Sequence, residues 1–124
     1  MSNVVNLKQS PNWSLKNAKT RKKYCTTRAR TVDEYQIPLS MVEQDKLSQN
    51  RDTDSAPAQV SELANNLQTM GQTYGICVEE VEGRKYPYAV RWGNTRFRAV
   101  NKLEGEDNAM KGCDKGHIWA SIYD

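Results

Sequence analysis

The stretch YPYAVRWGNTRFRAVNKL, residues 86–103, decides the fold because its pattern of apolar residues changes at one point. Up to Val90, aromatic and apolar residues occupy alternate positions, which predicts an extended strand. After Gly93 the apolar residues Phe97, Val100 and Leu103 recur at helical spacing, which predicts a helix. The stretch therefore predicts a strand, a tight turn and a helix.

The predicted turn has the properties of a phosphate site. Gly93 allows the backbone to approach a ligand closely, and Asn94 or Thr95 can cap the helix, so that first-turn N–H groups point outward. Such a helix end attracts anions, and Arg96 and Arg98 add full positive charges. We predict phosphate binding here. The alternative is that both arginines lie on a solvated helix face.

Residues 93–99, GNTRFRA, resemble the G-E-R-R-x-R-A box of the ParB amino-terminal domain, which belongs to the ParB/sulfiredoxin-like superfamily. Residues 36–39, QIPL, resemble the opening strand of that family, and Asn50-Arg51 resembles the polar residues that follow it. The resemblance implies that Arg51, Gly71 and Gln72 join the turn in a phosphate or nucleotide site. CTP or ATP is the nucleotide that it implies.

Departures from the family motif limit the chemistry that the resemblance implies. Sulfiredoxin has Gly-Cys-His-Arg at this turn, and Asn94 replaces the reacting cysteine, so reductase activity is excluded. ParB has Glu and Arg where this chain has Asn94 and Thr95, which weakens the expectation of nucleotide hydrolysis. The Gly-x-x-Gln-Pro loop of ParB is also imperfect at residues 71–75. Arg51 is closely followed by Asp52 and Asp54, so it has a second interpretation as part of a surface ion pair.

The rest of the pattern predicts an α+β fold. We expect a small mixed β-sheet with two main helices, ParB/sulfiredoxin-like, preceded by a basic N-terminal arm. Strands are predicted near residues 31–42, 74–81, 86–91 and 117–123, with a polar loop over residues 43–56. A helix is predicted over residues 55–70, capped by Ser55. Its apolar face comprises Val60, Leu63, Ala64, Leu67 and Met70.

Charge divides the chain into two predicted parts, an arm at residues 1–32 and a domain at residues 33–124. The arm has eight basic residues and no acidic one, whereas the rest has 10 basic and 15 acidic residues. We predict that residues 16–30 are solvated and become ordered on a polyanion or an acidic protein, anchored by Trp13. The alternative is a tail that only aids solubility. The candidate binding residues are Trp13, Lys16, Lys19, Arg21, Lys22, Lys23, Arg28 and Arg30.

Other classes of function receive less support. No run approaches the roughly 20 apolar residues of a membrane span, and there is no apolar secretory signal, so a cytoplasmic location is expected. Three widely spaced cysteines argue against a disulfide framework. Cys113 and His117 lack the paired cysteines of a structural zinc site, so no metal is predicted. The chain also lacks a second helical region for the helix-turn-helix of full-length ParB proteins.

These patterns predict a small ParB-like accessory protein, of phage or plasmid origin, that binds a nucleic acid or a nucleotide phosphate. DNA is expected rather than RNA. Two alternatives stay open: a module that docks on an acidic host protein, and a ParB-like nuclease. The carboxylates available to a nuclease, at positions 52, 54, 79 and 80, show no metal-binding spacing. No catalytic residue is predicted.

Overall fold

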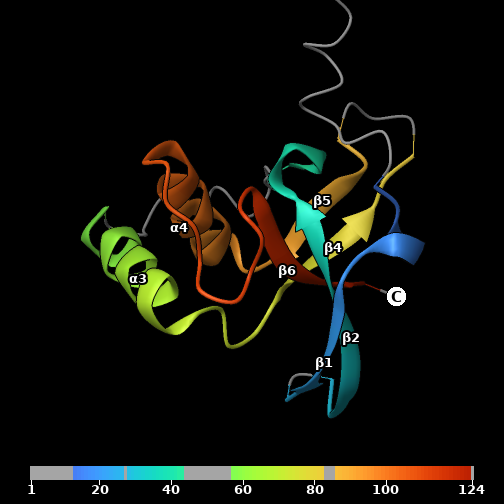
Figure 1. The fold of residues 1–124 in the computed structure, drawn as a ribbon. Coiled ribbons are helices and arrows are strands. Elements are labelled where there is room, and N and C mark those ends of the chain that lie inside the picture. Colours follow the sequence, from blue (N-terminus) through green and yellow to red (C-terminus); the bar gives the residue numbers. More distant parts are fainter. Residues whose placement is uncertain (1–12, 27, 44–56, 83–85, 124) are drawn as a thin grey trace, which may run out of the picture.

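The structure, a computed structural model, describes residues 13–26, 28–43, 57–82 and 86–123. Within these residues, six strands form one mixed sheet in the order β1-β2-β6-β4-β5-β3, and two helices lie together beside it (Figure 1). The strands are β1 (Thr20–Cys25), β2 (Arg30–Pro38), β3 (Val42–Glu43), β4 (Ile76–Glu80), β5 (Tyr88–Trp92) and β6 (His117–Ile122). The helices are α3 (Pro57–Met70) and α4 (Asn94–Gly105), with 3-10 turns η1 (Leu15–Asn17) and η2 (Leu39–Met41). The predicted α+β fold is confirmed.

The core lies between the helices and one face of the sheet. The central strands supply fully buried residues such as Ile37, Ile76 and Ile118, and these join one cluster with buried residues of both helices. The predicted inward residues Phe97, Val100 and Leu103 of α4 and Ala64 and Leu67 of α3 are all buried. This burial follows from helical spacing, which places each set on one side of its helix.

One predicted core residue, Met70, is wrongly assigned, because its surface is 78% exposed. The buried stripe of α3 ends one turn earlier, at Leu67. There the carbonyl of Leu67 accepts hydrogen bonds from the N–H groups of Gly71 and Lys111 at 3.0 and 3.2 Å. The chain therefore turns away before Met70 can reach the sheet.

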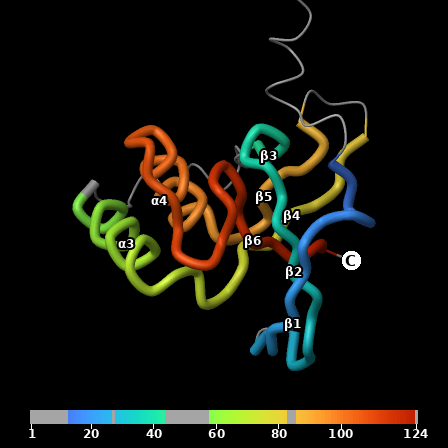
Figure 2. The backbone as a smooth tube through the Cα atoms, in the orientation of Figure 1, coloured from blue at the N-terminus to red at the C-terminus, as the bar shows by residue number. Residues whose placement is uncertain are grey.

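The prediction of a solvated segment at residues 16–30 is wrong for β1, which pairs with β2 along its whole length. Figure 2 shows the two strands side by side, extending away from the helices. The half-buried positions of β1 include the charged residues Arg21 and Lys23, so the apolar alternation that marks a strand is absent. Charged side chains are common on edge strands, where they discourage pairing with other chains. The predicted division at residue 32 falls inside β2.

Trp13 anchors the chain before β1 to the sheet, as predicted. Its indole N–H donates to the carbonyl oxygen of Gln36 at 3.1 Å, and its ring meets Tyr88 edge to face, with centroids 6.2 Å apart. The predicted cap Ser55 and residues 44–56 of the predicted loop over residues 43–56, with Arg51, lie outside the described residues, and Glu43 belongs to β3. No helix in the described ranges has the length and apolar character needed to cross a membrane.

Candidate phosphate-binding site

The predicted turn is present at the junction of β5 and α4. Gly93 occupies the N-cap position with φ at +100°, a left-handed conformation that favours glycine. A Cβ atom there would lie 2.7 Å from Cγ2 of Ile76 on the neighbouring strand. Gly93 is thus required by both its conformation and its close packing. It occupies the cap position for which the sequence suggested Asn94 or Thr95.

Arg96, in the first turn of α4, borders a cavity of about 260 Å³. The residue is half-buried, and its guanidinium has no hydrogen bond or ion pair with the described residues. Lys23 of β1 lines the same cavity. The structure therefore brings together one cation from the predicted turn and one from the predicted arm, which the sequence had placed in separate sites.

Aromatic side chains form much of the remaining wall of this cavity. Tyr24, Tyr74 and Trp92 border it and are all exposed, with 55%, 48% and 38% of their surfaces accessible. An aromatic ring offers a stacking surface for a base, and a nearby cation attracts the phosphate attached to it. The combination suits a ligand that carries both a planar ring and a negative charge.

A buried carboxylate, Glu34, holds one wall of the cavity in place. Its Oε1 lies 2.8 Å from Nε of Arg21, and its Oε2 accepts a hydrogen bond from the N–H of Gly75 at 2.6 Å. Arg21 also donates to the carbonyl oxygen of Gln72 at 2.7 Å and lies 4.4 Å from the centre of the Trp119 ring. These contacts tie β1 and β2 to the chain between α3 and β4.

Gly71 and Gln72, predicted at the phosphate, have structural contacts instead. The side-chain amide of Gln72 donates to the carbonyl oxygen of Trp119 and accepts from its N–H, both at 3.0 Å. A Cβ on Gly71 would lie 2.8 Å from the carbonyl oxygen of Lys111. Gln72 is buried and both ends of its amide are bonded, so the structure provides no ligand contact for it. Neither residue borders the cavity.

The other predicted residues of the turn diverge from Arg96. Arg98 borders a separate groove with Leu39, Val42 and Asn101, because two positions along a helix turn a side chain to nearly the opposite side. Asn94 is 5% exposed, and its Oδ1 has no hydrogen-bond partner within the described part of the chain. Of the predicted turn residues, Gly93 precedes α4 and Arg96 borders the cavity. Sequence reasoning missed Lys23 as their neighbour, since the pairing of β1 was not foreseen.

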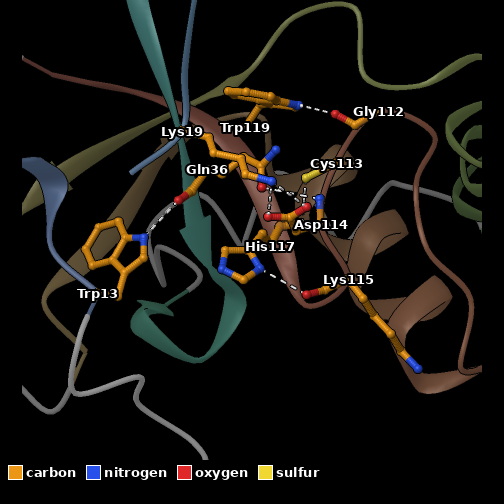
Figure 3. A network of polar contacts seen from close by, with 9 residues as sticks. All are labelled: Trp13, Lys19, Gln36, Gly112, Cys113, Asp114, Lys115, His117 and Trp119. Atoms are coloured by element: carbon orange, nitrogen blue, oxygen red, sulfur yellow. Dashed lines mark hydrogen bonds and ion pairs between the residues drawn. The ribbon is translucent and has the colours of Figure 1, made fainter. Parts of the chain in front are cut away.

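The remaining predicted binding cations do not form a single basic surface. Lys19 pairs with Asp114 at 2.9 Å, Lys22 with Asp33 at 2.7 Å, and Arg21 with Glu34. Figure 3 shows Lys19 and Trp13 meeting the chain around Asp114 and Gln36. Lys16 and Arg30 are exposed. Arg28 lies across the sheet, where its guanidinium donates to Sγ of Cys77 at 2.9 Å.

Cys113 and His117 lie close to Asp114 and form hydrogen bonds with neighbouring backbone carbonyl groups (Figure 3). The thiol of Cys113 donates to the carbonyl oxygen of His117 at 3.4 Å, and Nδ1 of His117 lies 2.9 Å from the carbonyl oxygen of Lys115. Burial raises the pKa of the Cys113 thiol to about 12, which opposes the thiolate form that binds metals. In the described ranges, no three His, Cys, Asp or Glu side chains are placed to hold a metal ion.

The mixed sheet, the two adjacent helices and the glycine turn that opens α4 define a ParB/sulfiredoxin-like domain. The sequence model of the ParB N-terminal domain matches residues 22–110, so the chain belongs to the ParB N-terminal domain family. This match begins within the predicted arm, in β1. No curated protein sequence matches the chain significantly.

Solved structures with a similar fold include a ParB protein and a sulfiredoxin. Chromosome-partitioning protein ParB from Caulobacter crescentus, in a C-terminally truncated form, has a TM-score of 0.57 and 15% identity. That match covers 73% of this chain and 44% of the ParB chain, so this chain spans less than half of that relative. Sulfiredoxin from Arabidopsis thaliana has a TM-score of 0.53 and 24% identity, with 73% of this chain and 84% of that chain covered.

Proposed function

We propose that this chain is a nucleotide-binding or nucleic-acid-binding accessory protein that holds a phosphate in the cavity bordered by Arg96 and Lys23. The observation that carries the proposal is the position of Arg96. Its guanidinium borders the cavity without a carboxylate partner in the described structure, close to the left-handed turn at Gly93. An arginine offers a planar fork of donors that matches a phosphate and keeps its charge at ordinary pH.

Two further features support a nucleotide rather than inorganic phosphate. The exposed rings of Tyr24, Tyr74 and Trp92 border the same cavity and provide surfaces for a base. The related structure of Caulobacter ParB was determined with CTP-gamma-S, which makes CTP the first nucleotide to test. We further propose that the protein acts in the cytoplasm and is of phage or plasmid origin.

The test is isothermal titration of the whole chain with CTP, ATP and short duplex DNA. Arg96→Ala is expected to abolish or strongly weaken the binding seen in the wild type. Arg98→Ala is the matched control, because it removes the same charge from the same helix but from a different groove. A melting curve by circular dichroism shows that each variant is folded.

Two results would contradict the proposed site. Equal losses in the Arg96→Ala and Arg98→Ala variants would indicate a general effect of charge rather than this cavity. No binding of any nucleotide or DNA by the wild type would favour the alternative of a module that docks on a protein.

A further inference from the structure

The sheet face opposite the helices is covered unevenly along β6. Ile118, Ala120 and Ile122 contact the core, so Trp119, Ser121 and Tyr123 lie on the other face. Trp119 is buried, and its indole N–H donates to the carbonyl oxygen of Gly112 at 3.3 Å. Tyr123, at the far end, is 41% exposed. This face of the sheet is therefore buried near Trp119 and exposed to solvent near Tyr123.

A β-bulge directs Trp92 to this same face. Val90 pairs with Val78 on the core side, but the next residue pair in the ladder is Trp92 with Cys77, so Arg91 is the extra residue. Cys77 is adjacent to Ser121 in the sheet and shares its face. Bulges commonly redirect a side chain in this way. Without the bulge, strand alternation would direct Trp92 into the core.

Trp92 and Tyr123 meet on the exposed face and are flanked by arginines. Their ring centroids are 6.1 Å apart and the rings are perpendicular, at 89°. The guanidinium of Arg91 lies 4.2 Å from the centre of the Tyr123 ring, and that of Arg28 lies 5.4 Å from the Trp92 ring. We call these four residues the aromatic surface. It adjoins the phosphate cavity, because Trp92 borders both.

The charges and ring geometry of the aromatic surface fit a single strand of nucleic acid. Arg28 and Arg91, with Lys23 and Arg96 at the cavity, are four cationic side chains on this side of the molecule, and Arg91 also pairs with Glu79 at 3.2 Å. Stacking on aromatic rings beside cations is the usual way in which proteins bind single strands. The bases of a duplex are parallel to one another, so two perpendicular rings cannot both stack on them. The bases of a single strand can rotate independently, so that one stacks on each ring.

We propose that the aromatic surface binds single-stranded nucleic acid, with bases stacked on Trp92 and Tyr123 and phosphates beside Arg28 and Arg91. The strand continues into the cavity, where a phosphate meets Arg96; only this last contact rests on the proposed function. Arg91 and Trp92 belong to β5, the N–H of Tyr123 donates to Val78 of β4, and the guanidinium of Arg28 donates to the carbonyl oxygen of Ile122 in β6. The surface is therefore held in shape before a strand binds.

The experiment measures the anisotropy of labelled oligo(dT) of about 12 nucleotides during titration with the whole chain at low and moderate salt. Tyr123→Ala and Trp92→Ala are each expected to weaken binding about 5- to 150-fold. Tyr123→Phe and Trp92→Phe, which keep the rings, should bind nearly as the wild type does. Met70→Ala changes another exposed apolar side chain, on α3, and should have no effect.

Three outcomes would overturn the inference. These are unchanged affinity in Tyr123→Ala, tighter binding of a duplex than of the single strand, and equally effective displacement of the oligonucleotide by polyglutamate. Polyglutamate is acidic but has no bases, so its success would indicate an acidic protein partner. CTP binding that depends on Arg96, without oligonucleotide binding that depends on Tyr123, would overturn this inference and leave the proposed function intact.

Discussion

The carboxylate of Glu34 lies 2.6 Å from the backbone nitrogen of Gly75 and 2.8 Å from Nε of Arg21. It is 3% exposed. A Cβ on Gly75 would lie only 2.8 Å from this carboxylate, so the contact requires a glycine. One buried acid therefore connects the β1–β2 hairpin with the loop that supplies Tyr74 and Gly75 to the cavity wall.

Replacement of Glu34 should destabilise the fold. Glu34→Ala leaves Arg21 and the N–H of Gly75 without their partner, and breaking a buried pair costs about 3–5 kcal/mol. The lower part of that range is expected, because the Arg21 side chain is 23% exposed. Urea denaturation measures the free energy of unfolding. Asp33→Asn, which breaks the exposed pair with Lys22, is the control and should change it little.

Gly93→Ala should destabilise the protein and distort the turn at the proposed phosphate site. An alanine at φ +100° is strained by about 1–2 kcal/mol, and its contact with Ile76 adds about 1–3 kcal/mol of overpacking. Gly105→Ala is the matched control. Nothing lies within 4 Å of a Cβ on Gly105, at the end of α4, so a gain of about 0.4–1 kcal/mol is expected. Equal effects of the two changes on thermal unfolding would contradict the prediction.

The stretch over residues 86–103 predicted its elements because strand and helix periods are local properties of the sequence. The bulge at Arg91 was not predictable in the same way, since it depends on the pairing of β5 with β4. As a result, the exposed position of Trp92 became clear only in the structure. The hairpin was missed for a related reason: Arg21 is half-buried because Glu34 neutralises it, and that partner lies 13 residues away.

The candidate site also combines residues from one short motif with residues whose contacts lie far away in the sequence. Gly93 and Arg96 were found from a short motif that belongs to one turn. Gln72 was assigned to the ligand by resemblance, but its amide is bonded to Trp119, 47 residues away. Lys23 entered the site through strand pairing. The contacts of Gln72 and Lys23 therefore depend on distant partners, which a local motif does not specify.

The partly buried thiol of Cys113 should make the free energy of unfolding depend on pH in the alkaline range. An exposed thiol titrates near 9.0, whereas burial raises the pKa of Cys113 to about 12. Above pH 9 the unfolded chain loses this proton first, so the free energy of unfolding should fall as pH rises toward 12. The slope from this one group is at most about 1.4 kcal/mol per pH unit.

Cys113→Ala isolates this contribution from those of other titrating groups. The difference in free energy of unfolding between wild type and variant should be constant below pH 9. Above pH 9, the free energy of unfolding of the wild type should fall relative to that of the variant. Parallel stability curves for the two proteins up to pH 11 would show that the folded protein ionises this thiol as readily as the unfolded chain does.

Gln72 provides the sharpest distinction between a structural and a ligand-binding role. Its amide forms hydrogen bonds with the N–H and C=O groups of Trp119 in β6. The pairing of β4 with β6 begins only at the next residue, Ala120. Gln72→Ala would leave the N–H and C=O of Trp119 buried and unpaired, at a cost of about 1–3 kcal/mol each. Gln68→Ala, at an exposed position of α3, is the control and should stay within about 0.5 kcal/mol of the wild type.

Stability and ligand affinity should respond in opposite ways to Gln72→Ala and Arg96→Ala. Urea denaturation should show a large loss for Gln72→Ala and a small one for Arg96→Ala, because the Arg96 guanidinium has no partner in the described structure. Nucleotide titration, at a temperature where both variants are folded, should show the reverse. If Gln72→Ala keeps full stability but loses the nucleotide, Gln72 contacts the ligand and the role assigned to its amide is wrong.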